Sequence, residues 1–194
     1  MVQSGIAGAP GPALSTGPAG RAVAQPMEPD LLTALQQHLS MERQAHIAYT
    51  ALALWTTERE LRGFAQHFKQ EAADELQHAA MVADYLVARG QSVTLEALPA
   101  PRQQWQNCTE ILAAVFAMEA EVTTSLQQLY ALAERSGDVR TTVFLDPIIQ
   151  GQIDAEHQAA HLLGRVRLAD GNPAALLLID GELSAGQSQP ATLA

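Results

Sequence analysis

The chain has 194 residues and a formal net charge of −10, with 11 Lys and Arg against 21 Asp and Glu. This length suits one domain with a sizeable core, and the acidic balance argues against a nucleic-acid partner, whose phosphates need a basic surface. Hydrophobic residues make up 47% and aromatic residues only 5%, with many Ala, Leu and Gln, which favours helices over sheets. The single Cys108 excludes a disulfide within the chain and fits a reducing compartment.

The first 26 residues differ from the rest of the chain. They hold 5 Gly, 4 Pro and 6 Ala but no acidic residue, a composition that predicts a disordered arm. No long apolar run follows a positive segment, so we expect no signal peptide, and Met27 could be the true start of translation. Because no stretch of about 18 apolar residues exists, we expect no membrane contact and a soluble, cytoplasmic protein.

Four long helical patterns and a short fifth follow Met27. In each long one, apolar residues recur at steps of three and four, which is typical of helices packed in a bundle. The fourth is expected to begin at residue 146, although a start near Thr141 with a kink at Pro147 is nearly as good. Residues 185–194 are expected to form a flexible tail. The predicted helices span residues 30–55, 60–89, 109–134, 146–167 and 174–183.

The lengths of the connections predict how the helices are arranged. Short links near residues 56–59 and 136–138 make the first and second helices, and the third and fourth, antiparallel neighbours. Residues 91–108 have little pattern and are long enough to cross along the side of a bundle. The prediction is an all-α four-helix bundle with a long crossover between helices two and three and a short fifth helix.

Three acidic residues occupy positions that should be core. Glu42, Glu75 and Glu119 lie on the first, second and third helices, each between apolar or aromatic neighbours. Burying unpaired carboxylates costs several kcal/mol each, and these apolar stripes contain no Arg or Lys. One such Glu alone could pair with an Arg or lie at a bundle end, but three together predict a bound cation. His78 lies three residues after Glu75, so both side chains can reach one metal ion.

The donor types predict which metal binds. Carboxylates with one imidazole suit iron or manganese better than zinc or copper, and a carboxylate-rich pocket favours the trivalent ion, so we expect Fe(II) to be oxidised here. Di-iron four-helix bundles take one Glu from each of two helices and Glu-x-x-His from the other two. Here the fourth helix offers Gln152 and Ala155 where the second Glu-x-x-His pair would stand.

Together these features resemble the ferritin family, and most of all the non-haem bacterial ferritins. The resemblance covers about residues 27–184, expected as one ferritin-like di-iron domain. It implies iron storage, with ferric mineral deposited inside a hollow shell of roughly two dozen copies of the chain. It rests on Glu42 seven residues before Tyr49, the Glu75/His78 pair beside Asp74, Glu119, Gln152, and the closing residues 178–183.

The resemblance also implies roles for individual residues. It makes Glu42, Glu75 and His78 ligands of a first iron, with Glu75 bridging to a second iron that Glu119 and Gln152 hold. The activity implied is that of a ferroxidase, with Fe(II) as substrate and O2 or H2O2 as oxidant. Tyr49, near the centre, would donate a hydrogen bond and could donate an electron, so it is counted with the catalytic residues.

Two further features of the sequence concern the surroundings of the centre. A third iron site of the bacterial type is doubtful, because Asp74 and Asp154 remain but Gly151 and Ala155 replace acids that such a site uses. His46 lies one turn after Glu42, where a neutral histidine bonded within the core is a simpler reading than an extra ligand.

Three alternatives remain open from sequence. A bacterioferritin would bind haem through a Met directly after the second-helix Glu, but this position is Leu76, so no haem is expected. A catalytically weak shell subunit that only nucleates mineral would be expected to lose iron ligands, whereas this chain keeps Glu42, Glu75, His78 and Glu119. A di-iron redox enzyme generally takes an acid or Glu-x-x-His from all four helices, which this fourth helix lacks.

Overall fold

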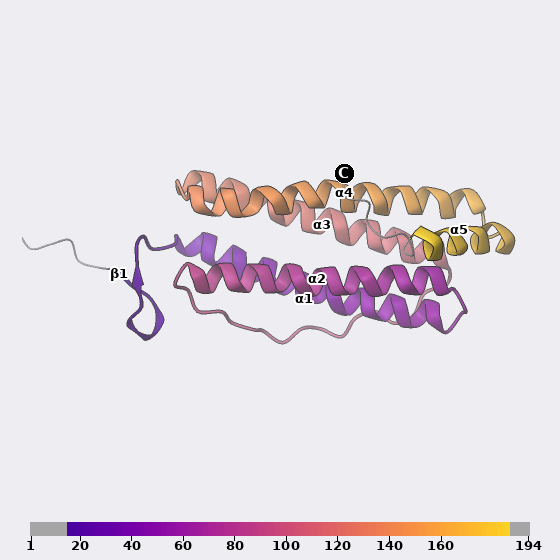
Figure 1. Cartoon of the computed structure of the whole chain (residues 1–194), viewed down its shortest axis with the longest axis horizontal. Coiled ribbons are helices and arrows are strands. Elements are labelled where there is room, and N and C mark those ends of the chain that lie inside the picture. Colours follow the sequence, from indigo (N-terminus) through magenta and orange to yellow (C-terminus); the bar gives the residue numbers. More distant parts are fainter. Residues whose placement is uncertain (1–14, 187–194) are drawn as a thin grey trace, which may run out of the picture.

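The computed structural model describes residues 15–186; residues 1–14 of the expected arm and 187–194 of the expected tail lie outside the described residues. Four long helices form two antiparallel pairs, α1 with α2 and α3 with α4, and a shorter helix lies at one end (Figure 1). This confirms the predicted four-helix bundle with a short fifth helix. The helices are α1 Pro29–Thr57, α2 Arg62–Ala88, α3 Cys108–Arg135, α4 Val139–Ala169 and α5 Pro173–Gly186.

The connection between α2 and α3 is the predicted long crossover. It runs along the outside of the α1–α2 pair from one end of the bundle to the other (Figure 1). Gln36 of α1 fastens it, because its side chain donates to the carbonyl oxygen of Ser92 at 2.7 Å and accepts from the amide of Thr94 at 3.2 Å.

A small β-hairpin precedes α1. Its strands, β1 (Ser15–Thr16) and β2 (Ala22–Val23), pair antiparallel. The side chain of Arg21 donates to the carbonyl oxygen of Val87 at 3.0 Å, so the hairpin lies against the end of α2. This end of the bundle is called the hairpin end below.

The fourth helix begins earlier than the preferred prediction. It starts at Val139 rather than residue 146 and continues through Pro147, so the alternative start near residue 141 was closer. Asp138 caps the helix by accepting from the amide of Thr141 at 3.3 Å, and the side chain of Thr141 is fully buried. Capping and packing of this first turn outweigh the backbone hydrogen bond that a proline removes.

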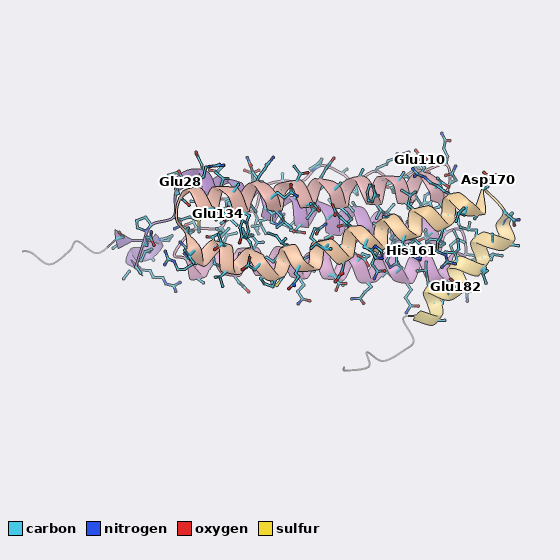
Figure 2. The ribbon with its side chains drawn as sticks, turned by 90° about the horizontal axis from the view of Figure 1, so that it is seen from above. Glu28, Glu110, Glu134, His161, Asp170 and Glu182 are labelled. Atoms are coloured by element: carbon cyan, nitrogen blue, oxygen red, sulfur yellow. The ribbon has the colours of Figure 1, made fainter. Side chains whose placement is uncertain are left out.

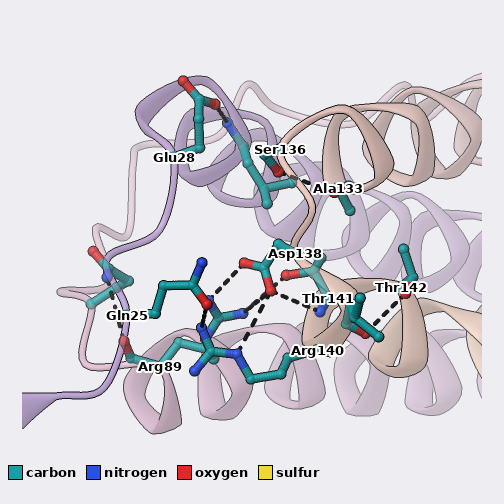
Figure 3. A network of polar contacts seen from close by, with 12 residues as sticks. Gln25, Glu28, Arg89, Ala133, Ser136, Asp138, Arg140, Thr141 and Thr142 are labelled. Carbon is teal, nitrogen blue, oxygen red and sulfur yellow. Dashed lines mark hydrogen bonds and ion pairs between the residues drawn. The ribbon is translucent and has the colours of Figure 1, made fainter.

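A buried ion pair ties α2 to α4 at the hairpin end (Figure 3). Arg89 of α2 donates to both carboxylate oxygens of Asp138, at 2.7 and 3.1 Å, and to the hydroxyl of Thr141 at 3.1 Å. Burial alone would raise the pKa of Asp138, but the guanidinium lowers it below its ordinary value. The contact therefore fixes where α4 starts relative to the last turn of α2.

Helix α5 closes the opposite end, which Figure 2 marks with Glu110 and Asp170 and which is called the α5 end below. The carboxylate of Asp180 accepts from the amide of Phe64 at 2.9 Å and so caps α2, whose own N-cap residue gives no side-chain hydrogen bond. A Cβ atom at Gly63 would lie 1.8 Å from the carbonyl oxygen of Asp180. Only glycine lets the two helices approach this closely.

The core consists of two apolar clusters, one toward each end of the bundle. Glu42, Glu75 and Glu119 lie between them, because each follows a residue of one cluster and precedes a residue of the other along its helix. The flanking residues are Leu39 and Tyr49 on α1, Ala72 and Ala79 on α2, and Val115 and Val122 on α3. Within residues 15–186, no helix is both long and apolar enough to cross a membrane.

Gly63→Ala is expected to lower the free energy of unfolding by roughly 1–3 kcal/mol, because the added methyl group overlaps the backbone of α5 and forces the helices apart. Gly164→Ala in α4 is the matched control, since a Cβ there meets nothing within 4 Å and alanine favours a helix. Denaturant unfolding of the two variants measures the difference. Equal stability of Gly63→Ala and the native protein would contradict the close approach of α5.

Candidate metal centre

Three buried carboxylates form a polar layer across the middle of the bundle. The exposed fractions are 1% for Glu42, 7% for Glu75 and 3% for Glu119. No Arg or Lys in the described part of the chain forms an ion pair with any of them. The layer therefore places three carboxyl groups in the core without an Arg or Lys partner, as the sequence predicted.

Two of these acids converge with His78. Ligand atoms of Glu42, Glu75 and His78 all lie within 4.8 Å of one another, close enough for one metal ion to contact all three. The Nδ1 atom of His78 is 3.0 Å from a carboxylate oxygen of Glu75 and 3.9 Å from Oε2 of Glu42. This Oε2 atom is buried and has no hydrogen-bond partner among the described residues. A buried carboxylate oxygen without a partner beside an imidazole fits a cation-binding site.

The pKa values of the two converging acids move in opposite directions. Burial, the largest influence, raises the pKa of Glu75 to about 8, with the carboxylates of Glu42 and Glu119 adding to the rise and the hydrogen bond with His78 opposing it. For Glu42, burial also acts upward, but the neighbouring side chains of His38, Glu75 and His78 together lower the pKa below its ordinary value. Without a metal, Glu42 therefore carries the charge and Glu75 keeps a proton at neutral pH.

Glu119 belongs to a second half of the centre. One of its carboxylate oxygens accepts a short hydrogen bond from the hydroxyl of Tyr49, and the other accepts from the Nε2 of Gln152 at 2.9 Å. Burial, followed by the charge of Glu119, raises the pKa of Tyr49 well above its ordinary value, so the phenol keeps its proton. The structure thus brings Gln152 of α4 to Glu119 of α3, as the sequence predicted.

Ala155 of α4 lines a cavity of about 580 Å³, whereas Gln152 does not. Tyr49 lines this cavity from the side of the centre, and Asp154 and Glu71 line it from α4 and α2. The cavity therefore reaches one of the two α4 positions where a second Glu-x-x-His pair would stand, while the other, Gln152, is bonded to Glu119.

Two residues near the centre were not predicted from sequence. His38, one turn before Glu42, is fully buried, and its Nε2 lies 2.9 Å from Oε1 of Glu42. Glu71, one turn before Glu75, is half-buried, and burial together with Glu119 and Asp74 raises its pKa to about 7. The spacing of four residues before each ligand was the available signal for both.

His46 has a structural role. Its Nδ1 lies 2.6 Å from the carbonyl oxygen of Ala72, and a carbonyl only accepts, so the imidazole donates across to α2. The contact fastens α1 to α2 one turn from the ligand Glu42, which favours the simpler of the two sequence interpretations.

The raised pKa of Glu75 makes a prediction about stability. Between pH 4.5 and about 8 the folded metal-free protein keeps a proton that the unfolded chain releases, so stability falls as pH rises through this window. Glu75→Gln removes the titration and should stabilise the metal-free protein by roughly 3 kcal/mol at pH 8 and far less at pH 5.

Thermal unfolding in the presence of a chelator measures the effect at both pH values. Asp84→Asn, an exposed substitution on the same helix, is the control and should change neither melting temperature. If Glu75→Gln gives the same small change at pH 5 and pH 8, Glu75 does not titrate as described.

Comparison with known proteins agrees with this geometry. A family model described as the ferritin-like domain matches residues 32–169, more than half of the chain. The bacterial non-heme ferritin of Staphylococcus haemolyticus is 30% identical over 127 residues, 66% of this chain and 76% of that protein. That of Staphylococcus aureus is 29% identical over 157 residues, 80% and 94% of the two chains. A crystal structure of an open pore ferritin from the archaeon Archaeoglobus fulgidus superposes with a TM-score of 0.80 at 26% identity, covering 82% of this chain and 98% of that one. The chain belongs to the ferritin family.

Proposed function

We propose that this chain oxidises Fe(II) at a two-iron centre inside its bundle and stores the ferric product within a shell built from many copies of itself. The observation that carries the proposal is the convergence of Glu42, Glu75 and His78 within 4.8 Å in a layer that contains no balancing Arg or Lys among the described residues. Fe(II) is the substrate, and O2 or H2O2 accepts its electron.

The first iron is held by Glu42, Glu75 and His78. Two carboxylates neutralise the charge of Fe(II), and their hard oxygen atoms stabilise Fe(III) more than Fe(II), which favours loss of an electron. Binding displaces the proton that Glu75 holds in the metal-free protein, so loading is expected to strengthen with rising pH.

The second iron is held more weakly. Glu75 bridges to it, Glu119 supplies a carboxylate, and Gln152 can turn its amide oxygen toward it in place of the present contact of its Nε2 with Glu119. An amide binds iron less strongly than a carboxylate, and Ala155 adds no ligand. Weak binding beside an open cavity of about 580 Å³ suits transit of the oxidised ion away from the centre.

Storage rests on charge and on assembly. A net charge of −10 per chain draws cations toward the surface and lowers the barrier to deposition of ferric mineral. Large apolar side chains are exposed near the α5 end: Leu168 is 88% exposed, Leu177 60% and Leu178 63%. Exposed apolar groups of this size support self-association through α4 and α5.

Loss of Glu75 tests the centre directly. Glu75→Ala should reduce the initial rate of Fe(II) oxidation by more than roughly 10-fold, because it removes a ligand of both irons. Stopped-flow absorbance after addition of Fe(II) measures the rate, and Asp84→Ala, an exposed acid on α2, should leave it unchanged. An unchanged rate in Glu75→Ala would sink the assignment of the centre.

Iron loading tests storage separately. Repeated additions of Fe(II) in air should load well beyond two ions per chain, and added salt should slow uptake because it screens long-range attraction. Iron content after removal of free metal, measured over time with and without salt, gives the loading and its rate. The particle size shows whether the chain forms a shell. Loading that stops at about two ions per chain would favour a small di-iron enzyme, and loading without rapid oxidation would favour a shell subunit that only nucleates mineral.

A further inference from the structure

His38 lies between Glu42 of the proposed metal centre and Ser125 of α3. It is the residue one turn before Glu42 on α1, and its exposed fraction is 0%. Its Nε2 lies 2.9 Å from Oε1 of Glu42, and its Nδ1 lies 3.0 Å from the hydroxyl of Ser125 on α3. One imidazole therefore contacts both a predicted iron ligand and a neighbouring helix.

The partners of the ring decide where its proton lies. A carboxylate only accepts hydrogen bonds, so the Nε2 of His38 carries the proton that faces Glu42. In the neutral tautomer, Nδ1 then accepts from the hydroxyl of Ser125. Nε2 lies 2.9 Å from Oε1 of Glu42 without a formed hydrogen bond to it or to any other described residue, so this contact is one that would tighten when a metal binds, as contacts at such centres often do.

The two oxygens of Glu42 are thereby made different. Oε1 faces His38 at 2.9 Å, whereas Oε2 is buried, has no hydrogen bond within the described chain and lies 3.9 Å from the Nδ1 of His78. Resting on the proposed iron chemistry, we infer that His38 is a positioning residue: it occupies Oε1 so that Glu42 presents Oε2 alone to the first iron.

The physical reason is the freedom of a glutamate side chain. Three side-chain torsions let a Glu bind a metal through one oxygen, through both, or swing away, and groups behind a ligand commonly decide among these states. Without His38, Oε1 would be a buried acceptor with no donor, and Glu42 would satisfy it by turning both oxygens toward the metal. His38 and Ser125 remove that alternative and hold the ligand in place before iron arrives.

A matched pair of substitutions separates the two contacts of the ring. In His38→Gln, the side-chain amide nitrogen can stand where Nε2 stands and donate to Glu42. In His38→Asn, the shorter amide can reach Ser125 but not Glu42. Both variants replace a buried imidazole with a smaller neutral amide, so they share the cost in packing.

The readout is binding of Co²⁺, without oxidation, followed by its visible absorption bands, with the rate of Fe(II) oxidation measured alongside. His38→Asn should weaken binding of the first Co²⁺ by roughly 10- to 100-fold and change its absorption bands, because the number of bound oxygens changes. His38→Gln should stay within about threefold of the native protein in affinity and keep the native bands.

The possible results separate a failure of the proposed function from a failure of the role given to His38. A native protein that binds no Co²⁺ and oxidises no Fe(II) would overturn the proposed function and this inference with it. Native binding that is unchanged in both variants, or reduced equally in both while their melting temperatures match, would overturn the inference and leave the proposed function standing.

Ser125 gives a second route should His38→Asn fail to fold. Ser125→Ala removes only the hydroxyl that holds Nδ1, and it should weaken the first Co²⁺ by several-fold, with recovery in Ser125→Thr, which keeps the hydroxyl. Native affinity in Ser125→Ala would overturn the role given to His38.

Discussion

The structure depends on one costly arrangement, three carboxylates buried in a layer between two apolar clusters. Taking a charged carboxylate out of water costs several kcal/mol, and within the described residues only imidazole, phenol and amide groups stand against these three. The metal-free layer lowers that cost by keeping a proton on Glu75 and on Tyr49. The remaining charge is what a metal ion would stabilise, so under the proposed function the layer that is costly to bury is also the layer that binds iron.

Contacts at the two ends of the bundle hold α2, which carries Glu75, in register with α4 and with α5. Arg89 pairs with Asp138 at the hairpin end, and Asp180 caps α2 at the α5 end. The first contact joins α2 to α4, which belong to different antiparallel pairs. The second joins α2 to the fifth helix, α5. The side chains proposed to bind iron come together only if the helices that carry them do not slide by a turn, since one turn moves a side chain by about 5.4 Å. A shift of that size would separate atoms that now lie within 4.8 Å.

Much of the fold and part of the centre could be predicted from sequence, and the reasons for the exceptions are physical. The repeat of apolar residues at steps of three and four predicted the helices, and a Glu and a His three apart predicted that both face one site. The start of α4 was placed late because Pro147 was given more weight than the cap at Asp138 and the packing behind it. Spacing along α1 could place His38 beside Glu42, but its contact with Ser125 on α3 depends on how the helices pack, and spacing along one helix carries no such information.

The two halves of the centre differ in how firmly their ligands are held. On the side of α1, Glu42 is supported through His38 by Ser125, so the support passes from one helix to another and is fully buried at the imidazole. On the side of α4, the carboxylate of Glu119 accepts from the amide of Gln152 and the phenol of Tyr49, its two partners within residues 15–186, and nearby Ala155 lines a cavity. An iron ion bound between these side chains would be held firmly on the side of Glu42 and more weakly on the side of Glu119. Under the proposed function, this asymmetry directs the oxidised ion toward the face of α2 and α4, where Glu71 and Asp154 line the cavity with further carboxylates.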